Sequence, residues 1–181
     1  MLAKQAPADQ VKPLYLQYAK LEEDYGLAGE AMKVYDQATE AVPDNEKLSM
    51  YEIYISRAAE IFGVPETRRI YEKAINIYEN AIKSDISNKD LLNKDIKTLS
   101  LKYAELEKSL GEIYRARELY GFASKYADPR SDPEFWNKWH EFEVQHGNED
   151  TFREMLRIKR SVSASNRQVT LTFHIHFYMS L

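Results

Sequence analysis

Four glycines at related spacings limit what this chain can fold into. They stand 37, 48 and 36 residues apart, and apolar residues recur eight and five positions before each of them. A third large residue comes one position before each glycine. Offsets of eight, five and one fall on one helical face, so each glycine is predicted to end an amphipathic helix in a left-handed conformation. The four are Gly26, Gly63, Gly111 and Gly147.

A second pattern follows each glycine. Its clearest form is Ala116-Arg117-Glu118-Leu119-Tyr120, a small residue followed by Arg, any residue, an aliphatic residue and an aromatic one. Tyr35 and Tyr71 hold the aromatic position in the first two units, and a small residue comes three positions later. Alternating large and small residues at helical spacing favours close packing between neighbouring helices. Each unit is therefore predicted to be two antiparallel helices joined by a short turn.

The repeat predicts an all-α, right-handed superhelical solenoid of about four antiparallel helix pairs. Its domain spans 11–162, between a flexible N-terminus over 1–10 and an atypical tail over 163–181. The units cover 11–42, 46–83, 89–127 and 133–160. The expected helices span 10–25, 28–41, 46–62, 65–82, 89–110, 112–126, 133–146 and 148–160. The longest gap between glycines leaves two alternatives open, a loop insertion or an extended helix that presents a contact surface.

Composition argues against several classes of function. The chain has no cysteine, which excludes disulfides, zinc ribbons and thiol nucleophiles. A net charge of −4 disfavours a dedicated nucleic-acid binder. The sequence contains no glycine-rich phosphate loop, no nucleophile elbow and no apolar run of membrane-spanning length. We expect no enzymatic activity, cofactor, metal, small-molecule substrate or membrane partner.

Acidic residues in the first helices suggest structural ion pairs. Glu22, Glu107 and Glu143 each stand four positions before a glycine, and each lies ten residues before the second position of the motif that follows. That position is Arg117 after the second of these glutamates and Arg153 after the third, whereas Met32 follows the first. We interpret them as bonds between the two helices of one unit rather than as acid–base pairs.

Two groups of residues are candidate partner contacts. Trp136 and Trp139 lie about one helical turn apart, where they pack in the core or form a binding hot spot. Arg153, Arg157 and Arg160 share a helical stripe. This stripe is either a solvated basic face near a helix C-terminus or a contact for RNA or an acidic partner.

The paired helices resemble tetratricopeptide arrays, and the Glu and small-Arg-x-aliphatic-aromatic patterns resemble their half-a-TPR (HAT) relatives. The run from Phe142 to Thr151, FEVQHGNEDT, is the most specific stretch. Residues 11–165 are similar to the C-terminal HAT repeats of the Syf-type pre-mRNA-splicing factors, a family that includes XPA-binding protein two. The resemblance implies a nuclear scaffold of the Prp19-associated (NineTeen) complex that contacts spliceosomal proteins, with at most weak or indirect RNA contact.

Two alternatives stay open beside that function. One is a HAT scaffold of another RNA-processing complex. The other is a non-functional truncated fragment, because family members are several times longer. After Asn166 the residues alternate with period two from Val169 to Phe177, which predicts a strand. This tail departs from the family and favours translation into intron sequence.

Overall fold

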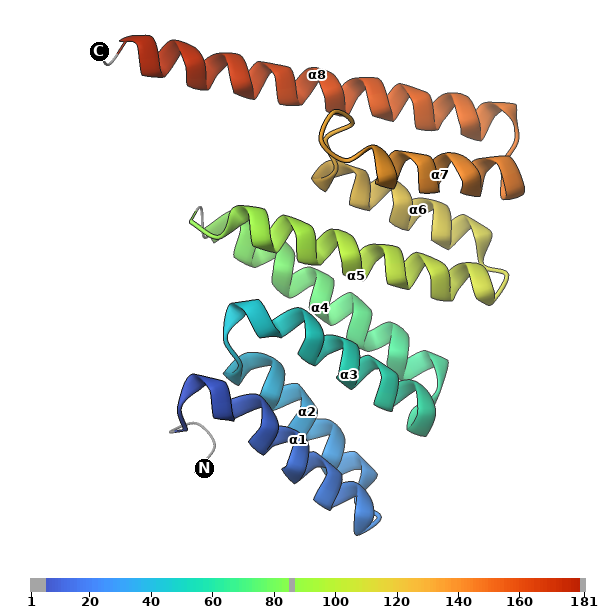
Figure 1. Ribbon diagram of the computed structural model, residues 1–181. Coiled ribbons are helices and arrows are strands. Elements are labelled where there is room, and N and C mark those ends of the chain that lie inside the picture. Colours follow the sequence, from blue (N-terminus) through green and yellow to red (C-terminus); the bar gives the residue numbers. More distant parts are fainter. Residues whose placement is uncertain (1–5, 85–86, 180–181) are drawn as a thin grey trace. The chain divides into compact units, whose positions relative to one another are not determined.

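The computed structural model describes residues 6–84 and 87–179, with side chains described through residue 169, and every longer element in these ranges is an α-helix (Figure 1). The all-α prediction is confirmed. The chain forms two compact units, Met1–Leu91 and Leu92–Leu181. No helix in the described ranges is long and apolar enough to cross a membrane. The helices are α1 (Ala8–Asp24), α2 (Ala28–Ala41), α3 (Asp44–Phe62), α4 (Val64–Ser84), α5 (Lys89–Ser109), α6 (Ile113–Ala123), α7 (Pro133–His146) and α8 (Glu149–Met179), with a 3₁₀ turn, η2 (Ser124–Tyr126), after α6.

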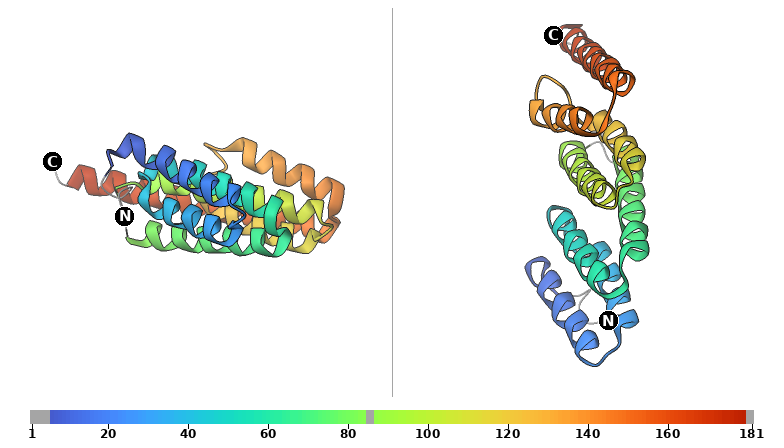
Figure 2. Two further views of the ribbon diagram at one scale, coloured as in Figure 1. Left: turned by 90° about the horizontal axis from the view of Figure 1, so that it is seen from below. Right: turned by 90° about the vertical axis from the view of Figure 1, so that its right-hand side faces the viewer.

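The first unit packs α1 to α4 in two layers. Figure 2 shows α1 and α3 in one layer and α2 and α4 in the other. Tyr35 of α2 stacks on Tyr54 of α3 with ring centroids 6.0 Å apart, and Tyr51 of α3 meets Tyr78 of α4 at 6.1 Å. Wholly buried alanines let the backbones approach closely beside these rings. They are Ala19, Ala31, Ala38, Ala58 and Ala74.

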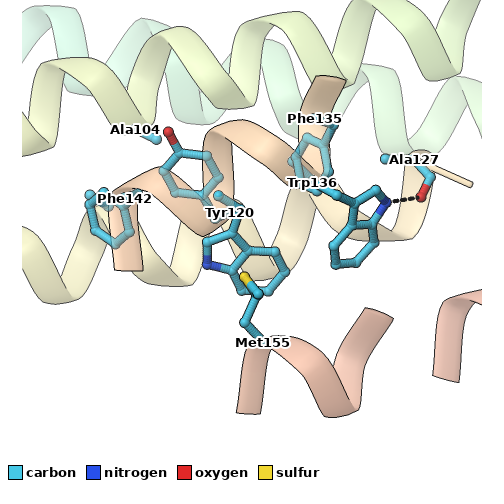
Figure 3. Close-up of a cluster of buried hydrophobic side chains, with 10 residues drawn as sticks. Ala104, Tyr120, Ala127, Phe135, Trp136, Phe142 and Met155 are labelled. Carbon is cyan, nitrogen blue, oxygen red and sulfur yellow. Dashed lines mark hydrogen bonds between the residues drawn. The ribbon is translucent and has the colours of Figure 1, made fainter. Parts of the chain in front are cut away.

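The second unit is built around aromatic side chains of α6 and α7, with Met155 of α8 packed against them (Figure 3). The indole Nε1 of Trp136 donates to the carbonyl oxygen of Ala127 at 3.0 Å, so this buried donor is satisfied. An ion pair between Lys97 and Asp132 ties α5 to the start of α7. Asp132 also caps α7 by accepting from the backbone amide of Phe135 at 3.2 Å.

Three of the four glycines confirm the predicted left-handed conformation. Gly26, Gly63 and Gly111 have φ of 75°, 75° and 79°. Gly147 corrects the prediction, because its φ is −102°. A Cβ there would overlap the carboxylate of Glu143 and lie 2.6 Å from the hydroxyl of Thr151. This position therefore requires glycine for close approach and not for backbone handedness.

The residue directly before each glycine is exposed, contrary to the predicted buried face. Tyr25, Phe62, Leu110 and His146 all lie at the turn between two helices, where the partner helix has only begun. The positions eight and five before the glycine are buried in α3 and α7. In α1 the corresponding Tyr18 and Leu21 are exposed.

Both ends of the chain differ from the prediction. Residues 1–5 lie outside the described ranges, while Ala8–Gln10, expected in a flexible end, form the first turn of α1. The expected strand after Asn166 is wrong, since α8 continues to Met179. No glycine or proline interrupts 148–181, and extending an existing helix is favourable even through residues with strand propensity. The histidines at 174 and 176 have side chains outside the described residues.

Candidate protein-interaction groove

A groove of about 590 Å³ is lined by α6, α7 and α8. Phe122, Met155 and Ile158 provide apolar lining, and Gly121 leaves space where α6 borders the groove. A Cβ built on Gly121 would meet no atom within 4 Å. A concave, mainly apolar surface with a few polar groups is the usual form of a binding site. This groove is therefore the candidate partner site of the second unit.

A buried ion pair lies among the residues that line the groove. Arg117 Nε of α6 donates to Glu143 Oε1 and Oε2 of α7 at 2.9 and 3.2 Å, and a terminal nitrogen donates to the carbonyl of His146 at 3.1 Å. The indole Nε1 of Trp139 donates to Glu143 Oε1 at 3.1 Å. The Glu143 side chain is fully buried, so these charge-assisted bonds replace its lost hydration.

The pairing corrects the sequence interpretation. Glu143 is bonded across helices, but by Arg117 of the preceding helix pair, so this bond joins the second helix of one pair to the first helix of the next. Arg153, the expected partner of Glu143, forms an ion pair with Glu149 of its own helix. Glu107 does form the expected bond between the two helices of its own pair, α5 and α6, but its partner is Arg115 at 3.2 Å instead of Arg117.

One sequence signal indicates that the acid and the Arg pair between successive helix pairs. Met32 stands at the Arg position of the first helix pair, and Ala59 stands at the Glu position of the second helix pair. If the acid and the Arg bonded within one helix pair, these two missing residues would belong to different bonds. If they bond between successive helix pairs, both missing residues belong to one bond, so its acid and its base are absent together.

Tyr120 of α6 packs against aromatic side chains of α7 (Figure 3). Its ring lies 6.3 Å from Phe135, 6.1 Å from Trp139 and 4.9 Å from Phe142, centroid to centroid. Burial raises the pKa of the Tyr120 hydroxyl to about 12. Tyr35 and Tyr71, the other motif aromatics, are also buried. Arg117 and Tyr120 thus lie one turn apart on α6, both against α7.

The two tryptophans lie in the core. Trp136 and Trp139 are 1% and 2% exposed, which supports the packing interpretation. Lys159 Nζ lies 5.8 Å above the Trp136 ring. Trp139 is among the residues that line the groove, and a partner contact there remains a prediction.

The basic stripe lies on the outer surface of α8. Arg153 and Arg157 are exposed and paired along the helix with Glu149 and Glu154. Arg160 donates from Nε to the carbonyl of Leu156 at 3.3 Å. Because α8 continues to Met179, the stripe does not stand at a helix C-terminus. The proposed dipole explanation for these cations is therefore wrong.

A smaller groove of about 320 Å³ occupies the equivalent place in the first unit, lined by α2, α3 and α4. Lys73 of α4 and Asp36 of α2 form an ion pair of 2.6 Å. Nearby, Arg57 of α3 pairs with Glu23 of α1 at 2.5 Å, and the hydrogen bond from Arg57 holds the pKa of that carboxyl below its usual value. Cross-helix charge pairs thus recur beside both grooves.

Comparison with known proteins agrees with this repeat geometry. The family model "Pre-mRNA-splicing factor Syf1/CRNKL1 C-terminal HAT repeat" matches residues 2–179, a range that includes most of the tail. The Drosophila melanogaster pre-mRNA-splicing factor syf1 homolog is 51% identical over 168 residues, covering 92% of this chain and 18% of that protein. The Emericella nidulans syf1 is 51% identical over 158 residues, covering 87% and 17%.

The human pre-mRNA-splicing factor SYF1 is 49% identical over 164 residues, covering 90% of this chain and 18% of that protein. The chain therefore spans less than a fifth of the length of these relatives. A family of stacked helical repeats implies a helical solenoid, and the antiparallel pairs fit it; the right-handed sense remains a prediction. With the match covering nearly the whole chain, this protein belongs to the Syf1/CRNKL1 C-terminal HAT-repeat family.

Proposed function

We propose that this chain is a protein-interaction scaffold in pre-mRNA splicing, working within the Prp19-associated (NineTeen) complex in the nucleus. Its partners are spliceosomal and Prp19-complex proteins. Binding of these proteins needs no cofactor, and RNA contact is weak or indirect. The relatives named as pre-mRNA-splicing factors support this role, because about half of the residues are identical over most of the chain.

The observation that carries the proposal is the groove bounded by α6 and α8. It combines apolar lining with a rigid polar base, since Arg117, Glu143 and Trp139 hold one another by hydrogen bonds. Such preorganisation reduces the entropy lost when a partner segment binds. A solenoid presents grooves of this kind along one surface, which suits a scaffold.

The test is affinity capture from nuclear extract with the full chain as bait, followed by mass spectrometry. A Gly121→Trp variant places a bulky side chain in the groove, and its Cβ meets no atom within 4 Å. Val144→Trp is the matched control, because Val144 is 67% exposed on α7 and lies outside the groove lining. Circular dichroism first shows that all three baits are equally helical.

We expect the wild-type chain and Val144→Trp to retain the same Prp19-complex and spliceosomal proteins, and Gly121→Trp to lose them. Capture of no splicing protein by the folded wild-type chain would refute the scaffold proposal. Equal capture by Gly121→Trp would refute the groove as the contact surface while leaving the scaffold role intact.

A further inference from the structure

Three charged side chains that line the groove of the second unit form no ion pair among the residues that the structure describes. They are Glu118, Lys125 and Asp150, and all three are exposed. The other two acids of the lining are each paired with an arginine, as Glu143–Arg117 and Glu154–Arg157. The groove therefore offers a ligand three charges that the protein itself does not compensate.

These charges give the groove an acidic end and a basic end. α6 and α8 run in the same direction, with α7 antiparallel to both (Figure 1). Glu118 and Asp150 stand toward the N-terminal ends of the two lining segments. Lys125 stands at the opposite end, in the 3₁₀ turn after α6, with its Nζ 4.9 Å from the centre of the Phe122 ring. Phe122 and Met155 lie between the two ends, so an apolar surface separates charges of opposite sign.

The groove of the first unit lacks this pattern. Its lining contains two acids and two cations, and each of the four is in an ion pair. The pairs are Lys33–Glu30, Asp36–Lys73 and Glu66–Arg69. This groove is also smaller, about 320 Å³ against about 590 Å³. It is therefore an internal comparison, a groove in an equivalent place without uncompensated charge.

We propose that the groove of the second unit binds a short extended peptide segment in which two apolar residues separate a basic residue from an acidic one. The basic side chain meets Glu118 and Asp150, and the acid meets Lys125, because complementary charge selects partner and register. Lys125 follows Glu118 by seven positions, which is about 10 Å of helix at about 1.5 Å per residue. Four extended residues cover that length at about 3.3 Å per step. The inference rests on the function proposed for this groove and adds the chemistry of the partner.

Two tetrapeptides are the probes, acetyl-Lys-Leu-Phe-Glu-amide and its reversed sequence acetyl-Glu-Phe-Leu-Lys-amide, which present the pattern in both chain directions. Binding to the full chain is followed by amide chemical shifts in ¹⁵N-labelled protein. We expect at least one probe to give saturable shifts concentrated at residues 117–125 and 150–158, with none at 29–36 or 62–69. Saturable shifts at both grooves, or at neither, would overturn the proposal.

Charge reversal tests each end of the groove. Glu118→Lys should weaken the better probe about fivefold or more, because an attraction becomes a repulsion, and a probe with Glu in place of its Lys should restore binding to that variant. Lys125→Glu should weaken the original probe similarly, and a probe with Lys in place of its Glu should restore it. Glu141→Lys is the matched control, since Glu141 is exposed on α7 and outside the lining, and it should bind as the wild type does.

All three substituted positions are exposed, so circular dichroism should show each variant to be as helical as the wild type. Equal binding of the original probe by Glu118→Lys and the wild type would overturn the proposal. If splicing proteins are captured through the groove but neither probe binds, the peptide pattern is wrong and the scaffold role stands. If a probe binds as expected but nuclear extract yields no splicing protein, the peptide pattern stands and the splicing role is refuted.

Discussion

Replacing Arg117 by Met should strongly destabilise the second unit, because it removes the cation from a fully buried carboxylate. Glu143 accepts Arg117 Nε at 2.9 and 3.2 Å, and its side chain has no solvent exposure. After the change only the indole of Trp139 would still donate to it. Methionine keeps the unbranched apolar stem of the arginine side chain, and Met32 already stands at the same position in the first helix pair.

The magnitude follows from the geometry. Two unit charges about 3 Å apart interact by roughly 5 kcal/mol at an effective dielectric constant near 20. Removing one partner of a buried pair costs about 3–5 kcal/mol. Because 21% of the Arg117 side chain is exposed and Trp139 still donates, the lower end of this range, about 3 kcal/mol, applies. With an m value of about 1.5 kcal/mol/M, the urea midpoint should fall by about 2 M.

Tryptophan fluorescence provides the assay, since both tryptophans of the chain lie in α7 and report on the second unit alone. The double variant Arg117→Met with Glu143→Gln removes the buried charge and keeps an acceptor for the indole of Trp139. It should recover at least about half of the loss. A single-variant cost below about 1 kcal/mol, or a double variant no more stable than the single one, would refute the reasoning.

Three further outcomes are expected. Gly147→Ala should lower the free energy of unfolding by about 1–3 kcal/mol, measured by the same fluorescence assay, because its Cβ overlaps Glu143; an unchanged midpoint would contradict this. Glu23→Gln should cost about 1 kcal/mol at pH 7 by weakening the pair with Arg57. Because the pKa of Glu23 is lowered by folding, this difference should vanish as the pH falls through its folded pKa, and a pH-independent difference in urea midpoint would count against the pair. Burial raises the pKa of Tyr71 to about 12, so the contribution of its neutral hydroxyl to folding stability is complete below pH 10 and declines up to pH 12. Tyr71→Phe should therefore reduce the loss of helical ellipticity at alkaline pH. An identical alkaline profile in the variant would show that ionisation of Tyr71 does not cause that loss.

Helix ends were predictable because their signals are local. Pro133 after a capping aspartate marks the start of α7, and three glycines close helices in the left-handed conformation. The expected helices from 28–41 and 133–146 agree with α2 and α7. Each of these decisions depends on a few neighbouring residues and on backbone sterics, which a single sequence displays directly.

The features that were missed depend on contacts between distant residues. Spacing along the chain made Arg153 the apparent partner of Glu143, yet the packing of α6 on α7 supplies Arg117 instead. The neighbouring sequence likewise does not show why residue 147 is glycine, because the reason is the space taken by the Glu143 carboxylate and the Thr151 hydroxyl. The tail pattern predicted a strand because periodicity alone ignores that a helix already precedes it.

The link between Arg117 and Glu143 has a consequence for exchanging repeats by recombination or design. A second helix that carries Met32 placed before α7 would leave Glu143 buried without a cation, and α6 placed before α3 would set an arginine against Ala59. A second helix and the first helix that follows it must therefore match at these two positions. A duplicated or transplanted helix pair must bring the neighbouring helix that completes this contact, so the natural module for such exchange runs from one second helix to the next first helix.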